Sequence, residues 1–316
     1  WYLTPGARLE HIITQSEGYY TEQNRHPITG ELLSQNSFDA STNRERNILL
    51  MGIGFVWRCR TSVEVYANAS QNYRAMNFSD IYVNNPNIII APGMQDEKGF
   101  TIDFGAKGKL LKEVVSFDAS VFMMQYRNRI GETLTTIENQ EGISRIVNYR
   151  DNIADALFVG VELVEEVDVT KWLFPNAEWQ LTWFNNLALV DARYQNAEVN
   201  AFNGNRVENV PVVNYKSGVN FRNGRFASGV QFSWISDQIT DASNAEFFPD
   251  ATVGVIPSYQ VLDATVSYSW KRLKLEGSVN NIADQIYFTR RAAGYPGPGI
   301  IPAQRRMVFM TLQVKI

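Results

Sequence analysis

The sequence predicts an all-β protein, an antiparallel β-barrel that spans a membrane, and three observations carry this prediction. Apolar and polar side chains alternate with a period of two, as in VLDATVSYSW at positions 261–270, where Leu262, Val266 and Trp270 share one face. The alternating segments are about ten residues long or longer. Short links and long links join them in turn. Strands of this length with one apolar face are what a barrel needs to cross a bilayer.

Alternation along the chain defines about twelve strands. They are predicted at residues 1–15, 47–58, 62–73, 97–109, 114–127, 149–169, 177–192, 211–222, 225–240, 259–270, 273–288 and 303–316. The second strand shows the pattern clearly, with Leu49, Met51, Ile53, Phe55 and Trp57 on one side. A Lys or Arg facing lipid near the bilayer midplane costs about 2–4 kcal/mol, so the opposite faces should point into a wet interior. Those faces carry Glu64, Asn68, Asp103, Lys107, Asp118, Lys216 and Asn220.

The links fall into two length classes. The short ones are residues 59–61, 110–113, 223–224 and 271–272, and the long ones are 16–46, 74–96, 128–148, 193–210, 241–258 and 289–302. Short turns on one rim and long loops on the other are typical of outer-membrane barrels, whose turns are periplasmic and whose loops are extracellular. A soluble sandwich or propeller also alternates, but its strands average about 5–6 residues.

Composition narrows the class of protein. The chain has 316 residues, 45% of them hydrophobic, and its mean hydropathy of −0.23 is that of a soluble protein. A membrane barrel can have the same mean hydropathy, because apolar residues occupy only every second position of its strands. The sequence contains no run of about 18 apolar residues, so it predicts no transmembrane helix. The net charge of −4 argues against nucleic-acid binding, which needs a concentrated basic surface.

The N-terminal residues and the single cysteine give two smaller expectations. The chain starts at Trp1 without a basic or apolar leader, so we expect a signal peptide upstream and a processed chain or a fragment here. Cys59 has no cysteine partner within the chain and falls in a short link. We therefore expect no internal disulfide.

The C-terminal region carries the most specific motif. Residues 279–300 read VNNIADQIYFTRRAAGYPGPGI, and this segment resembles the last hairpin of TonB-dependent outer-membrane receptors, most of all the ferric dicitrate transporter group. The segments YANASQNYRAMNFSDI, DEKGFTIDFGAKGKL and WYLTPGARLEHI, which start at positions 66, 96 and 1, are also similar to that group. The resemblance therefore extends over the whole chain.

The resemblance implies a barrel of about 22 strands that encloses a plug domain. On this interpretation, residues 1–316 are the C-terminal part of the barrel, and the plug, the TonB box and the first strands have no counterpart in the sequence. A self-contained barrel of about twelve strands is the alternative, since even strand numbers from 8 upward occur.

No catalytic constellation is visible, so we do not expect an enzyme. The two histidines, His11 and His26, lie in a predicted strand and a predicted loop, outside any metal-ligand or catalytic spacing. The GYPGPG segment is typical of a turn-rich loop and lacks the strand-then-helix context of a phosphate cradle. An outer-membrane lipase is disfavoured because no Ser/His/Asp arrangement can be assembled.

The candidate ligand-binding residues lie where predicted strands meet long loops. A ferric chelate such as ferric citrate exposes carboxylates, which guanidinium groups bind in a bidentate manner. The alternative for each arginine is a contact with lipopolysaccharide phosphates or with acidic residues of the loops. The candidates are Arg74, Asn77, Arg127, Arg129, Arg290, Arg291 and Tyr295.

The resemblance implies a receptor in the bacterial outer membrane that imports a ferric chelate, with ferric citrate as the first candidate. Its implied partners are the TonB energy-coupling complex, reached through the N-terminal region, and the surrounding lipid and lipopolysaccharide. No cofactor is expected, because the ferric chelate is transported as cargo. No nucleic-acid partner is expected either, because the net charge is −4. The alternatives are a receptor for another siderophore, haem or an oligosaccharide, or a receptor-like structural subunit of an outer-membrane complex.

Overall fold

The computed structural model describes residues 1–26, 28–39, 41–81, 88–138, 144–249, 251–292 and 299–315. A single sheet of 13 strands dominates it, and twelve of these strands follow one another along an antiparallel path. The path is β1 (Tyr2–Ser16), β4 (Thr42–Arg60), β5 (Val63–Arg74), β7 (Glu97–Leu110), β8 (Val115–Glu138), β9 (Ser144–Asp168), β10 (Trp179–Gln195), β11 (Val213–Asn223), β12 (Phe226–Ile235), β15 (Tyr259–Trp270), β16 (Leu273–Asn280) and β19 (Met307–Val314). The predicted all-β, antiparallel fold class with about twelve strands is confirmed.

The remaining elements are short. β6 (Ile88–Ile90) adds to β9 in parallel, and three two-stranded sheets pair β2 (Tyr19–Arg25) with β3 (Leu32–Asp39), β13 (Gln238–Ile239) with β14 (Val255–Ile256), and β17 (Phe288–Ala292) with β18 (Gly299–Pro302). The helices are α1 (Phe78–Ile81), α2 (Val169–Leu173) and the 3-10 helix η1 (Asn200–Phe202). In the part of the chain described, no helix combines the length and apolar character needed to cross a membrane.

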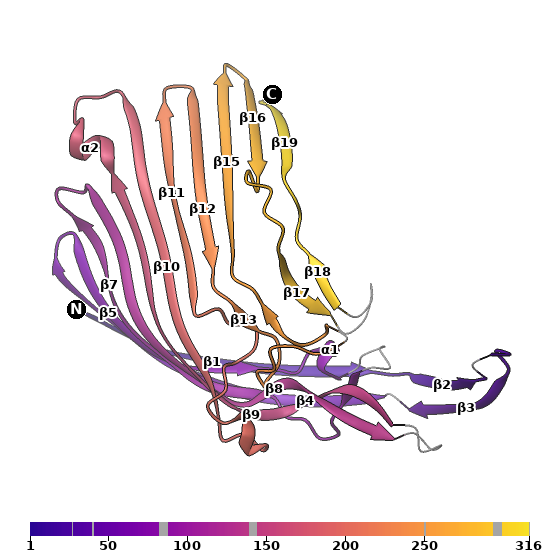
Figure 1. The fold of residues 1–316 in the computed structure, drawn as a ribbon. Coiled ribbons are helices and arrows are strands. Elements are labelled where there is room, and N and C mark those ends of the chain that lie inside the picture. Colours follow the sequence, from indigo (N-terminus) through magenta and orange to yellow (C-terminus); the bar gives the residue numbers. More distant parts are fainter. Residues whose placement is uncertain are drawn as a thin grey trace.

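The sheet curves like a trough (Figure 1). The short turns lie along one end, with α2, and the long connections with β13, β17 and β18 gather at the opposite end. Within the described residues β1 and β19 form the two edges and do not pair with each other. The described strands therefore form an open, curved sheet, and they do not close into the self-contained barrel considered as an alternative.

Several predicted loops are partly strand. β8 runs to Glu138 and β9 starts at Ser144, so their ladder continues through most of the link predicted at 128–148. Residues 16–46 likewise contain the ends of β1 and β4 and the β2–β3 hairpin. Beyond the apolar band the alternation of apolar and polar residues fades, while backbone pairing continues.

Other predicted strands are shorter than expected. The segment predicted at 225–240 ends as β12 at Ile235, and the one predicted at 273–288 ends as β16 at Asn280. Asn281 and Asp284 have φ of 53°, a left-handed conformation that ends the strand. The last strand begins at Met307 instead of residue 303.

The register separates an apolar outer face from a polar inner face. One outer row joins Phe104, Val121, Val161 and Leu189 across four neighbouring strands, and all four side chains are exposed. Because alternation places successive residues on opposite faces, this row belongs to a continuous apolar band along the sheet. A band of this kind is what the lipid-facing surface of a barrel requires.

Polar and charged side chains of the inner face lie side by side on neighbouring strands. Lys107 lies between Glu64 and Asp118 on the two neighbouring strands. Asn68 donates to Asp103 at 2.7 Å. The Tyr66 hydroxyl donates to Asp118, also at 2.7 Å. The prediction that these charged and polar residues share the face opposite the apolar band is confirmed.

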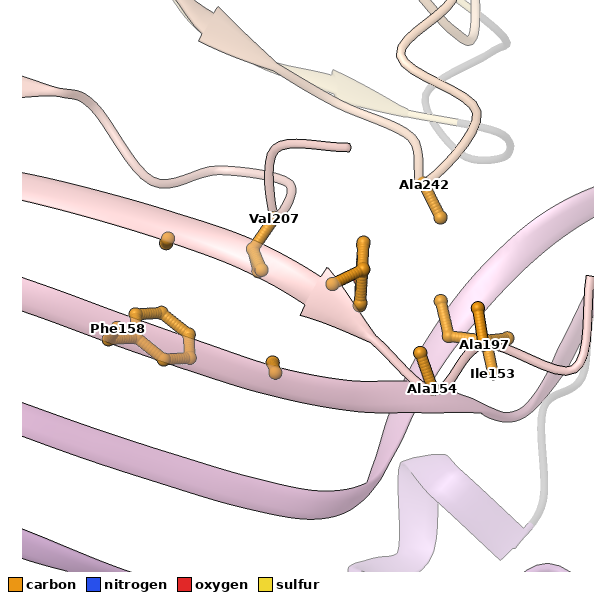
Figure 2. Packing of buried hydrophobic residues seen from close by; sticks show 9 residues of the cluster. Ile153, Ala154, Phe158, Ala197, Val207 and Ala242 are labelled. Atoms are coloured by element: carbon orange, nitrogen blue, oxygen red, sulfur yellow. The ribbon is translucent and has the colours of Figure 1, made fainter. Parts of the chain in front are cut away.

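The main buried core lies against the inner face at the loop end of the sheet (Figure 2). Phe158 of β9 and Tyr194 of β10 contribute from the sheet, and Val207 and Ala242 from the following loops cover them. The loops therefore fold back into the trough and hold a fixed shape there, which creates the setting for a binding site.

Gly160 offers a test of close packing on the inner face. A Cβ at this position would lie 2.5 Å from Phe122 Cζ and 2.6 Å from the Leu189 carbonyl oxygen, whereas a Cβ at Gly277 would be 3.7 Å from its nearest neighbour, in Val266. We predict that Gly160→Ala destabilises the protein by about 1–3 kcal/mol, because overpacking forces the ring and backbone to move. Gly277→Ala is the matched control and should change stability little. Urea unfolding of both variants measures this, and equal midpoints would contradict the packing shown by the structure.

Candidate ligand-binding site

A cavity of about 650 Å³ opens at the loop end of the sheet. Residues of β5, β8, β9 and β17 contribute to its wall together with the loops that follow β10 and β12. Four arginines and four carboxylates line it: Arg74, Arg150, Arg290, Arg291, Asp80, Glu132, Glu208 and Asp241. Groups of both signs that converge from distant parts of the sequence make this the strongest candidate for a ligand site.

Arg74, at the end of β5, is held between two carboxylates. Its Nη2 lies 2.8 Å from Asp80 Oδ2 and its Nη1 lies 3.0 Å from Glu97 Oε1. Asn77 positions Asp80, because its backbone N–H donates to the Asp80 carboxylate and its side-chain oxygen accepts from the Asp80 N–H. Asn77 therefore acts on the site through Asp80, whereas Arg74 faces the cavity directly.

Arg129 lies beneath the cavity wall and does not line it. Its Nη2 is 3.4 Å from Glu208 Oε1, and its Nη1 is 3.9 Å from Glu97, a side chain that is only 1% exposed. The Tyr194 hydroxyl donates to Glu208 from the buried core. Burial raises the pKa of the Glu208 carboxyl and also that of the Tyr194 phenol. The cluster joins β7, β8, β10 and the loop at residue 208, and so holds the cavity in shape.

Glu132 and Arg150 face each other across the β8–β9 ladder. Arg150 Nε donates to Glu132 Oε1 at 3.0 Å, and its Nη1 is 3.9 Å from Asp80. Sequence reasoning missed this pair because Glu132 fell in the link predicted at 128–148, so Arg150, in the strand predicted at 149–169, had no strand residue opposite it. Recognition that the two strands continue would have placed the two residues opposite each other.

Arg290 and Arg291 are neighbours on β17 with different environments. Arg291 donates to the Ala251 carbonyl oxygen at 2.7 Å and to the Val255 carbonyl oxygen at 2.9 Å, and its guanidinium lies 5.3 Å from the centroid of the Phe288 ring. Burial lowers the pKa of Arg291. Arg290 is exposed and lines the cavity, and its side chain has no hydrogen bond or ion pair to another residue in the described ranges. Arg291 therefore secures a loop, and Arg290 is available to a ligand.

Two other predicted residues lie apart from this cavity. Arg127 is on the outer-face side of β8, opposite Lys98 of β7. Tyr295 falls in 293–298, outside the described residues.

The NNIAD part of the C-terminal motif forms a corner that positions β17. The Asn281 N–H donates to Asp263 at 2.8 Å, and its side-chain amide donates to the Gln285 carbonyl oxygen at 2.9 Å. Arg305 Nε donates to Asp284 at 2.8 Å, and the Arg306 N–H donates to it at 3.0 Å. These bonds hold the pKa of Asp284 well below its usual range. The corner fixes the base of the last long connection and so directs Arg290 toward the cavity.

The described residues contain no group of three or more His, Cys, Asp or Glu arranged to hold a metal ion. The arrangement seen here, with guanidinium and carboxylate groups around a polar hollow, can form charge-assisted hydrogen bonds to a bound ligand.

Comparison with known proteins identifies the kind of sheet to which this cavity belongs. Residues 1–282 match the family model described as "TonB dependent receptor-like, beta-barrel". No curated protein sequence matches the chain closely enough to count as a relative.

Solved structures share the fold at low sequence identity. The chain is similar to the unliganded ferric citrate transporter FecA, with a TM-score of 0.71 and 20% identity over 99% of this chain and 42% of that one. It is similar to the ferric-catecholate import receptor Fiu from E. coli K12, with a TM-score of 0.66 and 17% identity over 98% and 41%. It is also similar to the copper transporter OprC, with a TM-score of 0.67 and 15% identity over 99% and 46%. The chain thus spans less than half of each of these structures, and the likeness concerns the fold.

Arg291 and Arg290 form a matched pair for a test of loop anchoring. We predict that Arg291→Gln speeds amide hydrogen exchange in residues 251–256 by about tenfold or more, because hydrogen bonds from a charged group are worth about 1.5–3 kcal/mol. Arg290→Gln should leave that exchange unchanged. Mass-spectrometric hydrogen exchange measures both variants, and equal acceleration in the two would show that Arg291 does not anchor the loop.

Glu208 gives a pH dependence with a defined sign. Because its pKa is raised above the ordinary value of 4.5, the folded state binds this proton more tightly than the unfolded chain does. The stability contributed by Glu208 is therefore greatest below pH 4.5 and declines as the pH rises through the raised pKa. Thermal unfolding of the native protein and of Glu208→Gln between about pH 4 and about pH 8 measures this. The native protein should lose stability relative to the variant as the pH rises, and a relative gain would contradict the assignment.

Proposed function

We propose an import function for this chain, which belongs to the TonB dependent receptor-like β-barrel family because that family's model matches residues 1–282. In this proposal the chain forms part of the wall of a receptor in the bacterial outer membrane. The receptor takes up a ferric chelate, with ferric citrate as the first candidate, and the TonB energy-coupling complex supplies the energy. The chelate is cargo, and no bond within it is made or broken.

The exposed Arg290 beside a cavity that already contains three partnered arginines is the observation that carries the proposal. Arg74 and Arg150 are held by carboxylates and Arg291 by carbonyl oxygens, whereas Arg290 has no such partner among the described residues. An arginine of this kind can bind a free carboxylate of a ferric chelate in a bidentate manner. Arg74, which lines the same cavity, can contribute a further charged donor to the same anion.

The two faces of the sheet support the membrane location. The outer face is apolar along the strands, and an aromatic row follows its turn end. Phe174 and Trp179 have ring centroids 5.3 Å apart, Trp179 and Phe221 are 6.0 Å apart, and Phe221 and Phe226 are 6.2 Å apart. Aromatic residues at this level are typical of the interface between membrane and water. The polar inner face suits a path for a hydrophilic cargo.

The equal number of carboxylates favours a second candidate cargo. Asp80, Glu132, Glu208 and Asp241 line the same cavity as the arginines. A chelate that carries hydroxyl or amine donors could bind these carboxylates, and its acceptor groups could bind the arginines. We therefore hold another siderophore as the alternative to ferric citrate.

The test compares binding of ferric citrate by the full-length receptor that contains this chain and by its variants. Arg290→Gln should weaken binding by about tenfold, the equivalent of about 1.4 kcal/mol. Arg225→Gln, an exposed arginine in a turn at the opposite end of the sheet, is the control and should bind within about twofold of the native receptor.

The outcomes separate the candidates. Isothermal titration with ferric citrate, and in parallel with a ferric catecholate chelate, reports which cargo is bound. Unchanged ferric citrate binding by Arg290→Gln would contradict the assigned residue. Binding of the catecholate alone would replace ferric citrate by the second candidate. Uptake of neither radiolabelled iron chelate by cells that depend on this receptor would contradict iron import.

A further inference from the structure

A second cavity lies where the barrel wall divides. β4 and β5 are paired from Arg60↔Val63 to Gly52↔Ser70, and their pairing ends there. β4 nevertheless stays paired with β1 up to Thr42, and β5 stays paired with β7 up to Arg74. The two strands thus part toward the loop end, and a cleft of about 560 Å³ occupies the gap.

A side chain connects β4 and β5 at the point where they separate. The Met51 N–H, next in line after the last paired residue of β4, donates to Gln71 Oε1 at 3.0 Å. A side-chain amide therefore takes the place of a ladder hydrogen bond at the point where the strands separate. The substitution satisfies the backbone and leaves the cleft open beyond it.

Two like charges face each other at the mouth of the cleft. Lys98 of β7 and Arg127 of β8 are cross-strand partners, which places their Cβ atoms about 4.5–5.5 Å apart. Both are exposed and both line the cleft, and within the described parts of the chain neither side chain forms an ion pair or a hydrogen bond. Like charges in opposite positions destabilise a sheet. A bound anion would relieve this repulsion.

Buried polar atoms at the same cleft lack partners. The Arg46 side chain is 10% exposed; its Nε lies 2.5 Å from Asp96 and its Nη1 donates to Thr14 at 2.9 Å, but its buried Nη2 has no partner. Asn72 Oδ1 is also buried without one. A buried unsatisfied donor costs about 1–3 kcal/mol, or more for a charged group, so Arg46 Nη2 is suited to an incoming anionic oxygen.

The rest of the lining is apolar and leads toward the outer face. Leu49 and Phe100 both lie on the side of the sheet that carries the apolar band. On β7 the band runs through Phe104, Ile102 and Phe100, and Lys98 is the next residue on that face. A basic pair directly beyond an apolar band lies at the level of lipid headgroups.

We propose that the cleft between β4 and β5 binds a phosphorylated lipid of the surrounding membrane. Lys98 and Arg127 contact the phosphate at the surface, Arg46 Nη2 supplies a donor from inside, and an acyl chain lies along Leu49 and Phe100. This inference rests on the membrane location proposed above. It is independent of the cargo, because the cleft shares no lining residue with the cavity that contains Arg290.

The test uses the full-length receptor, stripped of lipid in detergent and then titrated with bisphosphorylated lipid A. The native receptor should bind it, and the Lys98→Gln/Arg127→Gln double variant should bind it about tenfold more weakly or worse. The control is Lys112→Gln/Arg225→Gln, which removes two charges at the turn end and should leave binding unchanged. Lipid A without its phosphates should bind the native receptor as weakly as the phosphorylated lipid binds the double variant.

Each outcome has a defined meaning. Equal binding by the native receptor and the double variant overturns the site, as does equal binding of the phosphate-free lipid. Displacement of lipid A by inorganic phosphate at the same concentration overturns the claim that the ligand is a lipid. Insertion into vesicles is measured alongside by protease protection. A folded receptor that does not insert overturns the membrane location and the lipid site together, whereas an inserted receptor without phosphate-dependent binding overturns the lipid site alone.

Discussion

The requirement that backbone hydrogen-bonding groups find partners shapes the whole of this structure. A strand that faces lipid has no water to satisfy its N–H and C=O groups, so neighbouring strands must do so. Eleven consecutive antiparallel pairings meet that demand from β1 to β19. Once this register is set, the pleat alone decides which side chains face outward. Phe104 and Val121 then share the apolar face, while Lys107 and Asp118 share the polar one.

The same requirement explains where the structure departs from a regular wall. Where β4 and β5 part, Gln71 completes the bonding of Met51. Where the last connection leaves β16, Asn281 and Asp284 take the place of strand partners and bind the segments that follow. At the loop end, ion pairs such as Arg74 with Asp80 and Arg150 with Glu132 link neighbouring segments. Both candidate ligand cavities lie at such departures, because a regular ladder leaves no polar group free.

The sequence predicted the strands of the main sheet well because the pleat places successive side chains on opposite faces, and one of these faces is apolar. The prediction was less accurate where the alternation of apolar and polar residues ends. Residues 129–138 and 144–148 continue the β8–β9 ladder beyond the predicted strands, where alternation is weak, so Glu132 was not placed opposite Arg150. Conversely, VNNIADQIYF continues an alternating pattern past Asn280, although hydrogen bonds through Asn281 and Asp284 turn the chain.

Site residues were predicted less completely for a related reason. Residue type and loop proximity selected Arg74, Arg290 and Arg291 as candidate ligand-binding residues, and all three line the cavity. They could not distinguish the adjacent Arg290 and Arg291, since the loop carbonyl groups at Ala251 and Val255 that engage Arg291 are distant in sequence. They also could not show that Arg127 faces the opposite side of the sheet, which depends on its register with Lys98.

The central claim is that one face of this sheet contacts lipid and the other lines a water-filled interior. Spin labels at single cysteines along residues 261–268 of β15, in a Cys59→Ser background of the full-length receptor in vesicles, test it most directly. Accessibility to oxygen should peak at Leu262, Ala264, Val266 and Tyr268, and accessibility to a water-soluble nickel complex should peak at Val261, Asp263, Thr265 and Ser267. Equal access of the nickel complex to both sets would contradict the account.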